Sequence, residues 1–125
     1  MNFAREHDLR LAIKASGHDY LGRSTAKNSL LISTHLFQNI TFHDNFTVGK
    51  QDLGSAVTVG SGVALNTLYK ATKDQGKIFV GGTAATVAPA GGYFQGAGHS
   101  ALSPIFGLLA DNTLGMSLCP LSACG

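Results

Sequence analysis

The chain has 125 residues, of which 16 are glycine, and a formal net charge of +2 at neutral pH. This length allows one domain with its own core, or part of one. The small charge and the absence of a basic stripe argue against a nucleic-acid partner, and no apolar run approaches the length of a membrane span. The high glycine content indicates many turns or a backbone that lies close to a ligand.

The first half of the sequence predicts short strands separated by turns. Residues 1–8 lack the apolar core of a signal peptide and are typical of the last turns of a helix. Residues 9–14 then alternate with the period of a strand. Further strands are predicted at residues 29–34, 39–43 and 56–59, where Leu, Ile and Val are frequent.

Residues 64–75 form the most convincing predicted helix. Leu65, Leu68, Tyr69 and Thr72 recur at the spacing that places them on one helical face. Gly76 follows at the position of a C-cap. We predict a strand over residues 77–80, so that a strand–helix–strand unit leads into a glycine-rich run.

The glycine-rich run covers residues 81–103 and is almost uncharged. Glycine permits positive φ and a close approach of backbone to a ligand, and clustered glycines can direct backbone N–H groups at phosphate oxygens. Many α/β proteins bind nucleotide phosphates after a strand in this way. A loop with several tight turns explains the composition equally well.

Residues 14–24 contain the second informative motif, in which His18 stands between Gly17 and Asp19. A neutral imidazole is a competent nucleophile, and a neighbouring acceptor can fix its tautomer. The alternative is a turn histidine that hydrogen-bonds to backbone, and His99 has the same ambiguity. Spacing alone assembles neither a catalytic triad nor a metal site. Cys119 and Cys124 could pair, but free thiols or a disordered tail explain them better.

Several motifs, taken in order, resemble the FAD-linked oxidoreductases of the vanillyl-alcohol oxidase and berberine-bridge-enzyme type, and their fungal members in particular. Each motif is weak alone, but the order of the set is specific. The motifs are Ser16-Gly17-His18-Asp19-Tyr20-Leu21-Gly22-Arg23-Ser24, Gly81-Gly82, Thr86-Val87, Ala90-Gly91-Gly92-Tyr93, Gln95-Gly96-Ala97-Gly98-His99-Ser100, Leu102-Ser103-Pro104 and Gly107-Leu108-Leu109-Ala110-Asp111-Asn112.

The resemblance implies an α+β fold, namely a partial FAD-binding domain of the PCMH type. It would comprise a small βαβ-like lobe and a mostly antiparallel second lobe, with FAD between them. His18 would bond covalently to the flavin ring methyl. The other residues that the resemblance assigns to the cofactor are Ser16, Gly17, Asp19, Tyr20, Leu21 and Ser24 around the pyrophosphate, Thr86, Val87, Gly91, Gly92, Gly96 and Gly98 on the opposite side, and His99 and Asp111 in motifs that would face the cofactor.

Three departures from the family pattern refine this interpretation. Many relatives attach FAD a second time through a cysteine, but this chain has Ala84 there, so the histidyl bond is the single attachment expected. The pattern also has glycine where this chain has Ala88 and Ala97, and the added methyl groups would narrow the space for the flavin. Residues 1–112 follow the family as a partial FAD-binding domain, and residues 113–125 form a divergent tail.

Two functions remain open at this point. The first is the FAD-binding portion of a flavin-dependent oxidase that oxidises an alcohol, amine or C–H donor, with oxygen as acceptor. The second is a truncated, inactive fragment that binds flavin weakly or not at all. We expect a small-molecule substrate to be bound by a domain beyond residue 112, and we assign no catalytic residue and no metal within this chain. Neither a nucleic-acid nor a membrane partner is expected, while oligomeric state and localisation are left open.

Overall fold

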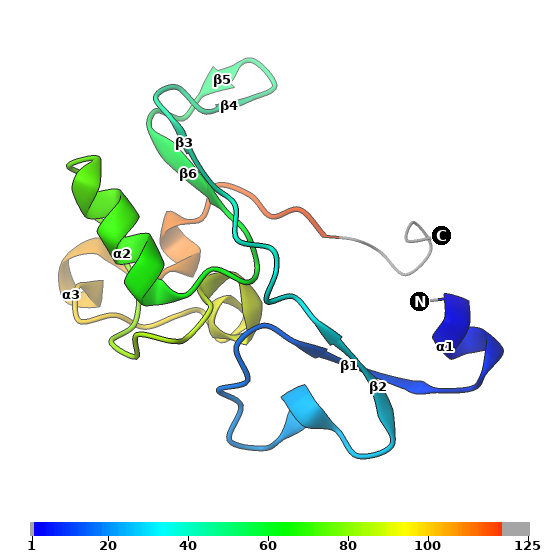
Figure 1. Ribbon diagram of the computed structural model, residues 1–125. Helices are drawn as coiled ribbons and strands as arrows, with labels where there is room; N and C mark the ends of the chain where they lie inside the picture. Colours follow the sequence, from blue (N-terminus) through cyan, green and yellow to red (C-terminus); the bar gives the residue numbers. More distant parts are fainter. Residues whose placement is uncertain (1, 119–125) are drawn as a thin grey trace.

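The computed structural model describes residues 2–118, and Cys119 and Cys124 lie outside this range. Within it the strands form three separate ladders of two strands each (Figure 1). The parallel pair is β1 (Arg10–Lys14) with β2 (Ser29–Ser33), and the two antiparallel pairs are β3 (Ile40–His43) with β6 (Ala56–Val59) and β4 (Thr47–Val48) with β5 (Gln51–Asp52). These strands, together with the helices, confirm the predicted α+β class.

The parallel ladder positions the histidine motif. The short helix α1 (Asn2–Glu6) precedes β1, and β1 pairs with β2 so that Ala12 lies opposite Leu31 and Ile13 opposite Ile32. Parallel strands need a crossover between them. Here the crossover is the loop of residues 15–28, which contains the 3-10 turn η1 (Arg23–Thr25). His18 therefore lies directly beyond the carboxyl end of β1.

The helix α2 (Leu65–Asp74) ends at a glycine cap. Gly76 has φ of +63°, its N–H donates to the carbonyl of Lys73, and the N–H of Lys77 donates to the carbonyl of Thr72. This is the hydrogen-bond pattern of a Schellman cap, which needs a residue in the left-handed region. The predicted helix and its cap are confirmed.

The strand predicted at residues 77–80 is wrong. The first N–H of this segment is taken by the helix cap, and no strand of the described chain pairs with it. The segment belongs to no ladder, and it packs through Val80, which is 7% exposed. A β-strand requires a hydrogen-bonding neighbour. The apolar pattern of residues 77–80 is local, so it could not show whether such a neighbour is present.

The core of the described chain gathers around α2. Val63, Leu65 and Leu68 are fully buried, and Val80, Ala88 and Leu109 are nearly so. The hydroxyl of Thr72, on the same helical face, donates to the carbonyl of Leu68 over 3.0 Å. The face predicted from the helical spacing is therefore the face that the helix buries.

The first turn of α2 is hydrogen-bonded to the glycine-rich run. The N–H groups of Leu65 and Asn66 donate to the carbonyls of Val87 and Ala85, both over 2.9 Å. Such first-turn N–H groups have no partner within their own helix. Ala64 offers no side-chain cap, so these two carbonyls satisfy the first two N–H groups of the helix, and the N–H of Thr67 donates to Oδ1 of Asn66. The most buried helix therefore fixes the backbone on both sides of Thr86.

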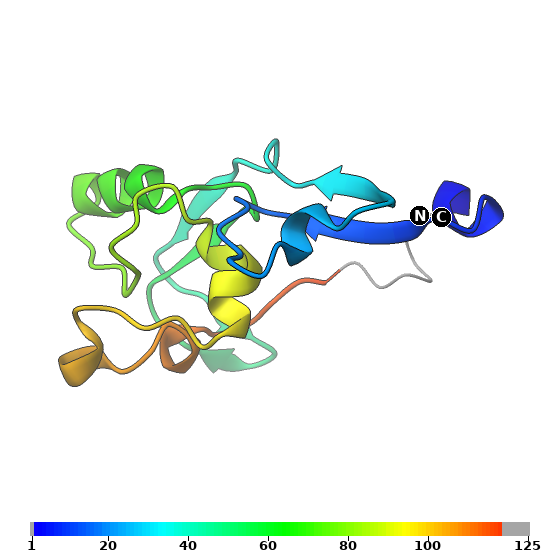
Figure 2. The ribbon, with the colours of Figure 1, turned by 90° about the horizontal axis from the view of Figure 1, so that it is seen from below.

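The second half of the chain continues without strands through residue 118. It contains a wide helical turn, η2 (Pro89–Tyr93), the short helix α3 (Ser103–Phe106) and the 3-10 turn η3 (Ala110–Asn112). Figure 2 shows η2, in yellow, between the blue loop after β1 and the orange segments α3 and η3. None of these turns was predicted, and neither was the small hairpin of β4 and β5. None of the helices among residues 2–118 has the length and apolar character needed to span a bilayer.

Candidate functional site

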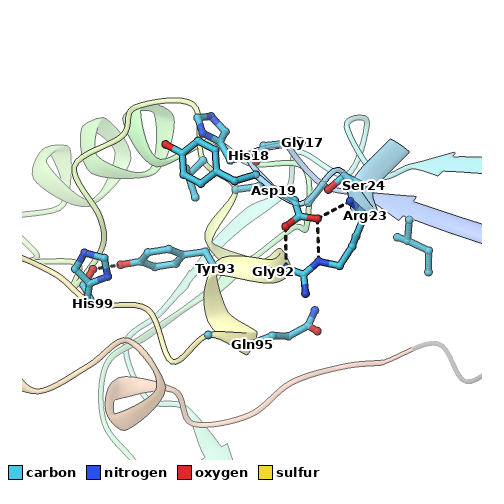
Figure 3. Close-up of a pocket in the computed structure, with 16 residues that line it drawn as sticks. Gly17, His18, Asp19, Arg23, Ser24, Gly92, Tyr93, Gln95 and His99 are labelled. Atoms are coloured by element: carbon cyan, nitrogen blue, oxygen red, sulfur yellow. Dashed lines mark hydrogen bonds and ion pairs between the residues drawn. The ribbon is translucent and has the colours of Figure 1, made fainter. Parts of the chain in front are cut away.

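The histidine loop and the glycine-rich run, far apart in the sequence, border one cavity of about 800 Å³. Figure 3 shows the loop and η2 on opposite sides of it. We name its two sides the loop wall (residues 15–24) and the turn wall (residues 86–99). The cavity is lined by Ile13, Ala15, Ser16, Gly17, His18, Asp19, Tyr20, Arg23, Ser24, Val87, Ala88, Gly92, Tyr93, Gln95, Gly96 and His99.

The loop wall is held together by Asp19 and Arg23. One carboxylate oxygen of Asp19 accepts from the backbone N–H of Arg23 over 2.6 Å and from its Nε over 2.9 Å. The other accepts from Nη2 over 2.7 Å (Figure 3). These charge-assisted bonds, with the guanidinium bond first among them, lower the pKa of Asp19 to about 2. The same carboxylate raises the pKa of Arg23, so the pair stays charged across the physiological range.

The turn wall is held together by Tyr93 instead. Its hydroxyl donates to the carbonyl of His99, over 2.5 Å, and burial raises the pKa of the phenol. Its ring packs against two glycines: a Cβ on Gly98 would lie 2.7 Å from a ring carbon, and one on Gly82 would lie 3.1 Å away. Close approach therefore requires glycine at Gly98, and it leaves little room for a side chain at Gly82. Gly92, by contrast, has nothing within 4 Å of its Cβ position, because it faces the open cavity.

A single side-chain hydrogen bond joins the two walls. Nε2 of His18 lies 2.8 Å from Oγ1 of Thr86. Gly17, with φ of +92°, makes the turn that places His18 here. Close packing also holds the walls together, since a Cβ on Gly91 would lie 2.6 Å from the Cβ of Ala15.

The structure brings most of the predicted cofactor residues to this cavity. Ten of them line it: Ser16, Gly17, His18, Asp19, Tyr20, Ser24, Val87, Gly92, Gly96 and His99. Of the others, Thr86 contacts His18, while Gly91 and Gly98 pack against Ala15 and Tyr93 as described above. Leu21 is 78% exposed and does not line the cavity. The carboxylate of Asp111 accepts from the N–H of Leu108 over 2.8 Å, which closes the turn around Gly107.

Sequence reasoning missed six of the lining residues. Ile13 and Ala15 belong to the end of β1 and the start of its loop, Ala88 and Tyr93 flank the glycines, and Arg23 and Gln95 offer polar groups. Four of the six carried a signal: Arg23, Tyr93 and Gln95 stand within the family-like motifs, and Ala88 was expected to narrow the space for the flavin. Ile13 and Ala15 reach the cavity through the path of the chain.

Comparison with known proteins identifies the family. Residues 1–119 match the family model described as FAD binding domain. An uncharacterised FAD-linked oxidoreductase of Arthroderma benhamiae is 50% identical over 118 residues, which are 91% of this chain and 20% of that protein. The flavin-dependent oxygenase ucdF of Aspergillus ustus is 45% identical over 116 residues, again 91% of this chain, and 21% of that protein.

Solved structures agree with this match. The crystal structure of the VAO-type flavoprotein MtVAO615 from Myceliophthora thermophila C1 superposes with a TM-score of 0.81 at 40% identity, over 87% of this chain and 20% of that one. The chain thus spans about a fifth of the length of the relatives it matches. The fold and the family expected from the motif order are both confirmed. The chain belongs to the FAD-binding domain family, and it is similar to the portion of fungal FAD-linked oxidoreductases and VAO-type flavoproteins that carries this fold.

Proposed function

We propose that the cavity between the two walls holds FAD, and that the chain is the FAD-binding portion of a flavin-dependent oxidoreductase. One observation carries the proposal: two glycine-bearing motifs that the family uses for its cofactor, far apart in this sequence, line one cavity. The family match and the names of the relatives support the same assignment.

The residues of the cavity suit a dinucleotide. A volume of about 800 Å³ falls within the range of small-molecule and cofactor sites, roughly 300–1,000 Å³. Gly17 and Gly92 border the cavity with bare backbone, and Gly92 leaves open the space that a Cβ would fill. Such backbone lets a phosphate or a ring system approach more closely than any side chain would.

Each wall has a distinct part in holding the cofactor. The loop wall supplies backbone around Ser16, Gly17 and Tyr20 for the pyrophosphate, and Arg23 retains N–H donors beyond those given to Asp19. The turn wall supplies Val87, Gly92 and Gly96. His18 would bond covalently to the flavin methyl, and Ala84 stands where many relatives have the cysteine of a second bond. When bound, FAD supplies a two-electron acceptor for the substrate's hydride.

The whole protein would oxidise an alcohol, an amine or an activated C–H donor and pass the electrons to oxygen. The donor must be held against the flavin, and a base must lie within reach of the proton that is removed. We place both requirements outside residues 1–112. This portion alone would then bind and flavinylate without turning over substrate.

Incubation of the chain with FAD, followed by a denaturing gel, tests the proposal. The wild-type band should keep flavin fluorescence, and His18→Ala should lose it while still binding FAD reversibly. The matched control is His43→Ala, because His43 also contacts a threonine, Thr58, but lies outside the cavity. Wild-type protein that binds FAD neither covalently nor reversibly would overturn the proposed cavity, and fluorescence retained in His18→Ala would overturn the histidyl bond.

A further inference from the structure

The residue that contacts His18 is flanked on both sides by backbone hydrogen bonds to α2. Thr86 lies between Ala85 and Val87, whose carbonyls accept from the first turn of α2. That turn begins with Leu65, which is fully buried. The hydroxyl of Thr86 is therefore positioned by the core of the molecule, although the threonine itself is exposed.

The hydrogen bond distinguishes the two ring nitrogens of His18. Nε2 contacts Oγ1 of Thr86 over 2.8 Å, whereas Nδ1 has no hydrogen-bond partner among residues 2–118. In a neutral imidazole one nitrogen carries the proton and the other carries the lone pair. A threonine oxygen that accepts from Nε2–H fixes the tautomer in which the lone pair is on Nδ1.

We propose that Thr86 is a positioning residue for flavinylation, which accepts a hydrogen bond from Nε2–H of His18 and so presents Nδ1 as the nucleophile. This inference rests on the proposed function. It adds what the chain itself does to the histidine: it selects the attacking nitrogen and restricts rotation of the ring. Thr86 contacts neither reacting atom.

Covalent attachment oxidises the flavin methyl carbon and reduces the flavin ring by two electrons. A bond forms between Nδ1 and the methyl carbon of the flavin, and one C–H bond of that methyl group breaks. Two electrons pass into the flavin ring, with protons drawn from the methyl group and from Nε2, and dioxygen then reoxidises the ring with release of hydrogen peroxide. Nε2–H becomes more acidic once Nδ1 is alkylated, so its hydrogen bond to Thr86 strengthens as charge develops on the ring.

The test follows covalent incorporation over time after FAD is added to protein produced without bound flavin. Thr86→Val, which keeps the shape of threonine, should slow incorporation about tenfold, the rate equivalent of one hydrogen bond. Thr86→Ser should remain within about twofold of wild type, because it keeps the hydroxyl. The matched control is Thr58→Val, which removes the same kind of contact from His43, 2.9 Å away, and should leave the rate unchanged.

A second measurement reads the tautomer without flavin. Nitrogen NMR of the apo protein should show His18 protonated on Nε2 in wild type and in Thr86→Ser, and as a mixture of tautomers in Thr86→Val. Covalent flavin in wild type with equal rates in Thr86→Val, or a Thr86→Ser variant as slow as Thr86→Val, would overturn this inference and leave the proposed function standing. Wild type without any covalent flavin would overturn both the histidyl bond and this inference.

Discussion

The two walls of the cavity are held in place by different physical interactions. In the loop wall the ion pair of Asp19 and Arg23 links the two ends of an exposed stretch of backbone. Arg23 is itself exposed, and Asp19 is 17% exposed. In the turn wall, Tyr93 packs against glycines, and Gly98 is buried. Ion pairs near the surface contribute little free energy and are screened by salt, whereas tight packing tolerates no added atoms. Mutations in the two walls should therefore differ both in magnitude and in pH dependence.

The largest effect is expected from Gly98→Ala in the turn wall. The new methyl group would lie 2.7 Å from the Tyr93 ring and 2.8 Å from the Cβ of Leu109, at a residue with φ of +70°. Strain in the left-handed region and overpacking should together lower the free energy of unfolding by about 3 kcal/mol. Urea denaturation measures this change in the free energy of unfolding. Gly92→Ala, with open space at its Cβ position, is the control, and an equal loss in both variants would contradict the packing argument.

A smaller effect is expected from Tyr93→Phe. The variant keeps the ring between Gly82 and Gly98 but leaves the carbonyl of His99 without its donor. The loss of one hydrogen bond should lower the free energy of unfolding by about 1 kcal/mol. Tyr20→Phe, in the loop wall, should leave it unchanged, because Tyr20 is fully exposed. If the two variants were indistinguishable in urea denaturation, the Tyr93 hydroxyl would not stabilise the turn wall.

Ala97→Gly should stabilise the turn wall slightly. Ala97 has φ of +66°, which explains why the family pattern places glycine there. Removing the Cβ relieves strain in the left-handed region, partly offset by the greater entropy of the unfolded chain, so a gain of about 0.5–1 kcal/mol is expected. Ala84→Gly, at an exposed residue without positive φ, should lower stability instead. Thermal denaturation of both variants measures the difference in stability. A loss of stability in Ala97→Gly would contradict the argument that its Cβ is strained.

The smallest effect on stability at neutral pH is expected from Asp19→Asn in the loop wall. This prediction therefore concerns how the stability of the loop wall depends on pH. The pKa of Asp19 is lowered from 3.8 to about 2 in the folded chain, mainly by its hydrogen bond from Arg23. A lowered carboxyl pKa stabilises the fold above the unfolded value, and this stabilisation is lost as pH falls through the folded value. The exchange rate of the Arg23 amide, divided by its intrinsic rate at the same pH, should therefore rise as pH falls from about 4 to about 2.

Asp19→Asn isolates this effect. The variant should lack the acid-induced rise at Arg23, relative to the intrinsic exchange rate, because its side chain does not titrate. Asp74→Asn, at the exposed end of α2, is the control and should keep it. An unchanged pH profile in Asp19→Asn would show that the ion pair does not hold the loop wall.

Local interactions determined what the sequence could predict by itself. The face of α2 and its cap at Gly76 depend on spacing within one helix and on the conformational freedom of one residue. The short strands β1, β2, β3 and β6 were recognised because their apolar patterns are local too. The family motifs could be recognised for a related reason: each glycine cluster marks a backbone conformation that few other residues can adopt.

The tertiary structure decided which segments meet. Residues 77–80 have the composition of a strand but no neighbouring strand in the described chain, so they form none. The contact between His18 and Thr86 spans 68 positions in the sequence and depends on the two carbonyls that hold Thr86 at the start of α2. Tyr93 and Gln95 reach the cavity only because η2 turns toward the loop after β1. Residue types showed which groups can bind a cofactor, but only long-range packing determines which of them face one another.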